Sequence, residues 1–331
     1  TGGGVHTFSN FDARDDGKTL TVQEAFRDSV NLVFIRLMRD VVQHHVFGGP
    51  RPAQAILAEA DHPERAVLLA RFADREGSRF IRDFYDRLAG APPDEALERL
   101  LTGVAPTPVR LAVIFRSAAP DASFEQFRAY LARHLPGRPL TDSALRGLYE
   151  RYAAERFSLA DRGYLARVHP LALWVAAYLR QHPQASLAAV LEASRDERQA
   201  VYGWLFRTRA RQAQDRRILS VLESDAFAEI HRGWRRLGYP FDSLVPSYAT
   251  AIGSSGDRPA ALAELAGILV HEGIRAPTVQ LEQLRLAAHT PYETVLRRRA
   301  GPGERVMAPE VAATLRQAMG LVVTHGTARR L

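Results

Sequence analysis

The sequence predicts a mainly α fold, and three observations lead to this prediction. The stretch from about residue 50 to 238 is rich in Ala, Leu, Arg and Glu, which favour helices. Proline and glycine, Gly77 among them, interrupt this stretch at intervals that leave room for eight to eleven amphipathic helices. The stretch has no convincing two-residue alternation typical of strands. Only residues 278–298 have a pattern compatible with β structure, and we expect at most a short β-hairpin there.

Composition limits the class of protein further. The chain has 331 residues, 46% of them hydrophobic and 24% charged, which is ordinary for one or two globular domains and argues against a disordered, collagen-like or coiled-coil chain. It has no cysteine, which excludes disulfides, cysteine-ligated zinc and a cysteine nucleophile. The longest purely apolar run, Leu171 to Leu179, is far shorter than the roughly 20 residues of a membrane span, so we expect none.

The N-terminal region combines a polar loop with two helices. Residues 1–20 contain the glycines, asparagine and aspartates of loops and turns. Thr21 and Glu24 have capping-box spacing, which predicts a short helix beginning at Thr21. Ser29 and Asn31 then offer a break or a new cap. A second helix is expected from about Leu32 to His45, with one apolar face formed by Val33, Leu37, Met38 and Val41.

The remaining elements are predicted from the glycines and prolines that mark their ends. The stretch that follows Gly48-Gly49-Pro50, up to about Gly238, is interpreted as an all-α domain without an internal repeat. Residues 239–259 combine Gly, Ser, Pro and Asp as an ordered loop does, and Gly273 should end a helix over 260–273. A final helix is expected to begin at Pro309, after Ala308, and to end at Gly326.

Motifs for common cofactors are missing from the sequence. It has no H-E-x-x-H, no G-x-G-x-x-G and no phosphate-binding loop with a lysine, and Lys18 is its only lysine. His44 and His45 are adjacent, so on a helix they point in different directions and form a poor metal site. We therefore predict neither a metal nor a cofactor.

Arginine supplies nearly all of the positive charge, and the net charge is +7. Arginine runs occur at 207–217, 235–236 and 297–299, and a basic stripe of this kind attracts phosphates. However, no aromatic side chains are interleaved for base stacking, and no known DNA-binding motif is present. We therefore interpret the runs as solvated helix faces and predict no nucleic-acid partner.

Three blocks of sequence strongly resemble the transpeptidase domain of penicillin-binding proteins. Residues 21–42 (TVQEAFRDSVNLVFIRLMRDVV) are similar to the family's approach to its Ser-x-Asn motif, which Ser29-Val30-Asn31 matches, and Asn10-Phe11-Asp12 resembles the lead-in. Residues 237–273 resemble the family's second block, and residues 307–328 resemble the helix that ends in Gly-Thr-Ala before a Lys-Thr-Gly strand. A Ser-x-Asn triplet alone carries no information, but three blocks in this order do.

The resemblance implies a fold, an activity and roles for two residues. The helical part of a β-lactamase-like transpeptidase domain would occupy residues 1–47 and 237–331, interrupted by the insertion at 48–236. Ser29 would relay a proton to the leaving D-alanine amine, and Asn31 would hold the substrate's acyl amide. Val30 should point into the core. From the residues alone, Ser29 and Asn31 can equally be a helix break and a cap.

Departures from the family pattern restrict what this segment does alone. The nucleophile belongs to a Ser-x-x-Lys motif, but Asp15 stands three residues before the only lysine, and no Lys-Thr-Gly is present. We therefore expect the isolated chain to be inactive, as a segment of a longer D,D-transpeptidase that cross-links peptidoglycan stem peptides and reacts with β-lactams. The resemblance places that parent, with an anchor outside this chain, at the periplasmic face of the inner membrane. The segments NLVFIRLMRDVV and GTARRL resemble bifunctional synthases, which have an upstream glycosyltransferase, more than monofunctional ones.

Two other interpretations remain open at the level of sequence. An all-α binding module of a cell-wall protein would carry the Ser-x-Asn triplet by coincidence or as a decayed site. A basic helical protein that binds nucleic acid would use the arginine runs. The insertion itself can be a spacer, or a docking surface for a periplasmic protein partner.

Overall fold

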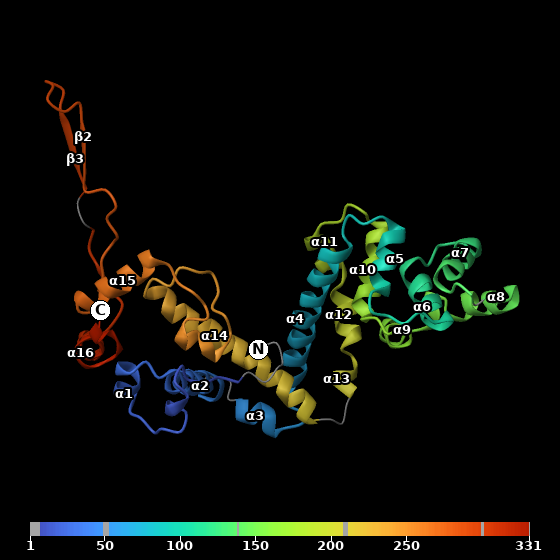
Figure 1. Ribbon diagram of the computed structural model, residues 1–331, viewed down its shortest axis with the longest axis horizontal. Coiled ribbons are helices and arrows are strands. Elements are labelled where there is room, and N and C mark those ends of the chain that lie inside the picture. The colour runs from blue at the N-terminus through green and yellow to red at the C-terminus, as the bar shows by residue number, and fades with distance from the viewer. Residues whose placement is uncertain (1–6, 49–52, 138, 208–210, 299–300, 331) are drawn as a thin grey trace. The chain divides into compact units, whose positions relative to one another are not determined.

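The computed structural model describes residues 7–48, 53–137, 139–207, 211–298 and 301–330 (Figure 1). The fold is mainly α, as predicted, with a few short antiparallel strands. The chain forms two compact units, and each is described by itself. Unit 1 comprises residues 1–55 and 222–331, and unit 2 comprises residues 56–221.

Unit 1 begins with a loop and two helices whose ends are set by local chemistry. Helix α1 (Val22–Arg27) has the predicted capping box, in which the Thr21 hydroxyl accepts from the Glu24 N–H and the Glu24 carboxylate accepts from the Thr21 N–H. Helix α2 (Asn31–Phe47) follows after a short turn. The lead-in contains a one-turn helix, η1 (Ala13–Asp15), and α3 (Ala53–Ala58) spans the boundary with unit 2.

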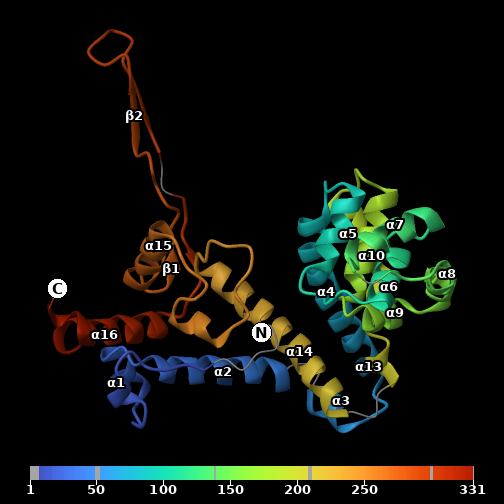
Figure 2. The same cartoon turned by 45° about the vertical axis from the view of Figure 1, so that its right-hand side comes forward.

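The C-terminal part of unit 1 combines helices with two strand pairs. Helix α15 (Pro259–Val270) and helix α16 (Pro309–His325) pack against each other, and α16 also packs against α1 (Figure 2). The predicted hairpin is formed by β2 (Gln283–Leu286) and β3 (Thr294–Arg297), paired with Leu284 opposite Leu296. A second pair, β1 (Ile274–Arg275) with β4 (Glu304–Arg305), was not predicted. The one-turn helices η3 (Tyr248–Ile252) and η4 (Thr327–Arg330) complete the unit.

Unit 2 is a bundle of short helices around α4 and α10, which lie side by side (Figure 1). Proline occupies the first position of several helices, where its missing N–H costs nothing. The prolines that interrupt the sequence therefore mark helix starts. The elements from residue 63 onward are α4 (Pro63–Leu88), α5 (Pro93–Leu101), α6 (Pro108–Ala118), α7 (Phe124–His134), α8 (Asp142–Arg151), η2 (Ala154–Arg156), α9 (Leu159–Ala166), α10 (Pro170–Gln181), α11 (Leu187–Ala193), α12 (Arg195–Val201) and α13 (Trp204–Arg207).

The core of unit 2 is continuous and apolar. Leu111, Ile114, Phe127, Leu171 and Leu173 are fully buried in one cluster, so the apolar run 171–179 contributes to the core of the bundle. Two ion pairs with buried arginines also connect distant parts of the unit. Arg65 contacts Asp215 at 2.7 Å and Arg198 contacts Asp74 at 2.6 Å.

Two local predictions are wrong, each for a tertiary reason. Helix α2 buries Ile35, Met38, Val42 and Val46, whereas Leu37 and Val41 are exposed, because α2 packs on η3 with the other side of its apolar surface. Gly77 does not interrupt α4. A Cβ there would lie 2.8 Å from the Arg198 side chain, so the glycine lets Arg198 cross the helix closely.

The unit boundaries also differ from the predicted insertion at 48–236. Helix α14 (Arg211–Arg236) is continuous, and its C-terminal part belongs to unit 1 because Phe227 and His231 contact the loop region around Tyr248, Tyr239 and Phe241. Twelve α-helices, α3 to α14, cover the described part of 53–236, against eight to eleven predicted. Within the described residues, none of the helices has the length and apolar character to cross a membrane.

Candidate active site

Ser29 lies in the turn that joins α1 to α2, and the backbone geometry of this turn is specific. The Val30 N–H donates to the Ala25 carbonyl at 2.9 Å, and the Ser29 N–H donates to the Phe26 carbonyl at 3.4 Å. This is the Schellman ending of a helix, which requires a left-handed residue and usually has glycine there. Ser29 takes that position with φ 58°, a conformation that costs a non-glycine residue about 1–2 kcal/mol. Its side chain is exposed.

Val30 and Asn31 complete the motif in opposite ways. Val30 is 3% exposed and packs into the core, as predicted, whereas Asn31 is half-buried at the first position of α2. Among the described residues, no side chain or backbone group forms a hydrogen bond with the Asn31 carboxamide. An amide with unused donors and acceptor can hold a peptide bond of a ligand.

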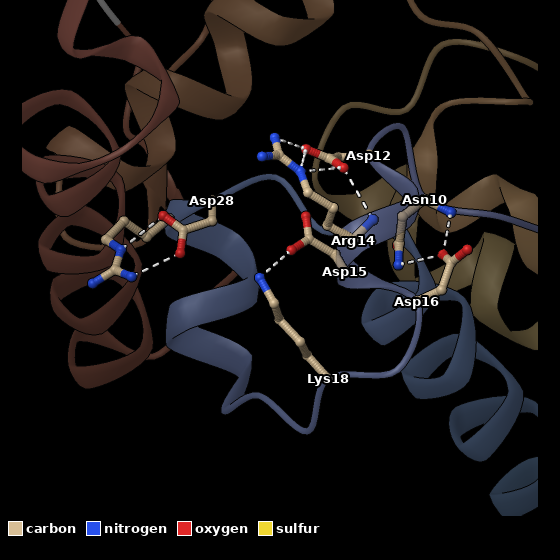
Figure 3. Close-up of polar contacts among 8 residues, drawn as sticks. Asn10, Asp12, Arg14, Asp15, Asp16, Lys18 and Asp28 are labelled. Atoms are coloured by element: carbon tan, nitrogen blue, oxygen red, sulfur yellow. Dashed lines mark hydrogen bonds and ion pairs between the residues drawn. The ribbon is translucent and has the colours of Figure 1, made fainter.

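The start of α2 is capped by a residue from the lead-in loop. Val30, at the N-cap, has no side-chain hydrogen bond to the helix. Instead the buried Asn10 accepts from the Leu32 N–H at 2.9 Å through Oδ1. Asn10 Nδ2 in turn donates to Asp16 at 3.0 Å (Figure 3). The Asn-Phe-Asp lead-in therefore holds the N-terminus of the helix that carries Asn31.

The Ser29 hydroxyl meets a residue 298 positions away. Ser29 Oγ and Thr327 Oγ1 lie 2.9 Å apart, a normal hydrogen-bond distance between hydroxyls. Thr327 is the threonine of the Gly-Thr-Ala sequence that follows α16. The first and third blocks singled out from the sequence are thus in direct contact.

Gly326 makes this contact possible. A Cβ at Gly326 would lie 2.3 Å from the Arg27 carbonyl oxygen and 2.9 Å from the Arg27 side chain. Only glycine allows the end of α16 to approach the end of α1 this closely. The approach places the next residue, Thr327, beside Ser29.

Charged groups around the turn are paired. Arg27 forms a two-pronged contact with Asp28, at 2.9 and 2.7 Å, which holds the pKa of the Asp28 carboxyl below its ordinary value. The only lysine, Lys18, contacts Asp15 at 2.7 Å (Figure 3). Hydrogen bonds from Arg14 lower the pKa of the exposed Asp12 to about 2. Asp28 and Asp12 are thus anionic at neutral pH.

The other candidate groups form no comparable site. No group of three or more His, Asp or Glu in the described part of the chain is arranged to hold a metal ion. Two arginines of the run at 207–217 have partners inside unit 2. Arg211 donates to the carbonyls of Leu57 and Ala58 at the end of α3, and Arg217 lies over the rings of Phe72 and Trp204. Residues 208–210 lie outside the described residues.

Sequence reasoning selected Ser29 and Asn31 but missed Thr327 and Asn10 as members of the site. The signals were present in Gly-Thr-Ala and Asn-Phe-Asp, yet a single sequence does not say which residues meet across 298 positions. Comparisons of the chain with protein-family models, with curated proteins and with solved structures find no match.

Proposed function

We propose that this chain is the segment of a penicillin-binding D,D-transpeptidase that supplies its Ser-x-Asn motif, in a parent whose Ser-x-x-Lys and Lys-Thr-Gly motifs lie outside it. The observation that supports this is the 2.9 Å contact between Ser29 and Thr327. Two blocks selected for their likeness to one family, at opposite ends of the sequence, meet at their motif residues. A coincidental Ser-x-Asn triplet has no reason to lie against Gly-Thr-Ala.

The proposed reaction uses the hydroxyl of Ser29 as a proton relay. In acylation, the parent's nucleophilic serine oxygen bonds to the carbonyl carbon of the penultimate D-alanine, and the carbon–nitrogen bond to the terminal D-alanine breaks. The proton lost by the nucleophile reaches the leaving amine through the Ser29 hydroxyl, which is general-acid catalysis. The carboxamide of Asn31 binds the acyl amide and orients the substrate. Water or a second stem-peptide amine then accepts the acyl group.

Exposed apolar side chains on α16 support the idea that further chain covers unit 1. Val311, Leu315, Met319 and Val323 are 38% to 60% exposed and recur every four residues, so they form one stripe. Among the described residues of this helix, only Ala312 is buried. A long apolar stripe usually marks a surface that another element covers. We propose that the rest of the transpeptidase domain is that element.

Substrates and place of action follow from the same proposal. The parent would act on peptidoglycan stem peptides at the periplasmic face of the inner membrane and would be acylated by β-lactams. Unit 2 would be an inserted domain that docks a periplasmic protein partner, and an upstream glycosyltransferase would make the parent bifunctional.

The test is covalent labelling with a fluorescent penicillin. The parent gene should encode Ser-x-x-Lys upstream and Lys-Thr-Gly downstream, and the full-length protein should be labelled, with unlabelled drug blocking the label. Ser29→Ala should slow acylation of the parent by roughly a hundredfold with little loss of folding, whereas Ser143→Ala, at an exposed serine of α8, should acylate at the wild-type rate.

Two outcomes would contradict the proposal. Specific labelling of the isolated 331-residue chain would show that its nucleophile lies inside it. A wild-type acylation rate in the Ser29→Ala parent would remove the relay role of Ser29.

A further inference from the structure

The hydrogen bond between Ser29 and Thr327 can run in either direction, and the two directions have different chemical consequences. Each hydroxyl has one proton to donate and two lone pairs that accept. If Ser29 donated to Thr327, its proton would be unavailable for a leaving amine. If Thr327 donates, the Ser29 proton stays free, and the bond received makes Ser29 a better donor through cooperative polarisation.

The surroundings of Thr327 fix its position tightly. The Gly326 N–H donates to the Val322 carbonyl at 3.1 Å, and the Gly326 carbonyl accepts from the Arg329 N–H at 3.2 Å. Gly326 itself lies against the backbone of Arg27. Thr327 is therefore the first residue of η4 and directly follows a glycine held by backbone hydrogen bonds on both sides.

The backbone of Ser29 is fixed as well. Its left-handed conformation is held by the two hydrogen bonds that end α1, while the side chain remains exposed. Among the described residues, Thr327 is the only hydrogen-bond partner of the Ser29 hydroxyl. A serine without this partner could rotate among three staggered positions.

We propose that Thr327 is a positioning residue for Ser29: its hydroxyl donates to Ser29 Oγ, selects one orientation of that side chain and leaves the Ser29 proton for the leaving amine. This inference rests on the proposed transpeptidase function. It assigns to the Gly-Thr-Ala sequence a part in the reaction through Ser29, with glycine allowing the approach and threonine supplying the hydrogen bond.

The experiment measures acylation of the full-length parent by a fluorescent penicillin over a range of concentrations. Thr327→Val keeps the shape of the side chain and removes the hydroxyl, so the maximal acylation rate should fall roughly tenfold, part of the hundredfold or more contributed by a general acid. The half-saturating concentration should change less than twofold. Thr327→Ser restores the hydroxyl and should restore the rate to within twofold of wild type.

A matched control makes the same chemical change in the preceding helix, α16. Thr314 in α16 is exposed, and within the described part of the chain its hydroxyl donates only to the Glu310 carbonyl one turn earlier. Thr314→Val should leave both acylation parameters unchanged. In the Ser29→Ala background, Thr327→Val should cause no further loss of rate, because Thr327 acts through Ser29.

Three results would overturn the inference. The first is a Thr327→Val parent that acylates at the wild-type rate while Ser29→Ala is slow, which leaves the proposed function intact. The second is a Thr327→Ser parent as slow as Thr327→Val, which would assign the effect to the methyl group. The third is a wild-type parent that penicillin does not acylate, which would remove the proposed function and this inference together.

Discussion

Replacing Ser29 by glycine separates the effect of this residue on the stability of unit 1 from its effect on acylation. Ser29 ends α1 at φ 58°, where a side chain is unfavourable by about 1–2 kcal/mol. Glycine removes that cost but adds about 0.5–1 kcal/mol of backbone entropy. Ser29→Gly should therefore stabilise unit 1 by about 1 kcal/mol relative to Ser29→Ala, since both variants lose the hydrogen bond to Thr327 and only alanine keeps the strain.

Tryptophan fluorescence during urea denaturation can measure this difference in unit 1 alone. The chain has three tryptophans, of which Trp174 and Trp204 lie in unit 2 and Trp234 lies in unit 1. In a background with Trp174→Phe and Trp204→Phe, the signal comes from Trp234. The free energies of unfolding of Ser29→Gly and Ser29→Ala are then compared with the slope m unchanged.

The reasoning would be refuted by a Ser29→Gly chain that is no more stable than Ser29→Ala, because the cost of the left-handed conformation would then not exceed the entropy cost of glycine. If the expected gain appears and the Ser29→Gly parent acylates as slowly as the Ser29→Ala parent, glycine would give a more stable unit 1 than alanine without restoring the acylation rate. Serine at this position would then be explained by its hydroxyl.

Three further predictions concern stability. Asn10→Ala should destabilise unit 1 by about 1–2 kcal/mol, because the Leu32 N–H loses its cap, and a change below 0.3 kcal/mol in the Trp234 assay would contradict this. Asp215→Ala should cost unit 2 about 3 kcal/mol in urea denaturation, since it leaves the buried Arg65 without its carboxylate, and Asp215→Asn should cost less. Burial lowers the pKa of His169 to about 4, so the native state holds this ring neutral while an unfolded chain protonates it near pH 6.5. Stability should therefore fall by up to about 3 kcal/mol as the pH drops from 6.5 to 4, and His169→Asn, which keeps an acceptor for the Leu171 N–H, should flatten that part of the pH profile.

Local chemistry allowed several element ends in unit 1 to be predicted from the sequence. The capping box of Thr21 and Glu24 is present, α16 begins at Pro309 and ends before Gly326, and the hairpin lies within 278–298. Each of these signals lies within a few residues of the feature that it predicts. This is why they can be recognised in one sequence without knowledge of distant contacts.

The predictions that were wrong depended on distant contacts. Gly77 looks like a breaker, yet it lies inside the 26-residue α4 because Arg198, far along the chain, packs against it. The apolar surface of α2 is wide enough to offer two faces, and packing on η3 selects the one with Ile35 and Val42. No local pattern near 221 marks a boundary, because α14 continues through it.

The site shows the same division between local and distant information. Ser29 and Asn31 were selected by resemblance, and the left-handed backbone of Ser29 has no local signal because glycine is the usual residue there. The partners of the site, Asn10 and Thr327, were visible only as parts of motifs. Their roles required knowing that one caps α2 and the other touches Ser29.

The contacts of the site explain how a domain as large as unit 2 can be inserted between its parts. The hydrogen bonds and close approaches described for Ser29 and Thr327 come from residues 10–32 and 322–329, all in unit 1. Unit 2 has its own continuous apolar core, which contains no residue of the site. The entropy of closing a chain around an insertion rises only with the logarithm of its length. An inserted unit with its own core is therefore compatible with the Ser29–Thr327 contact.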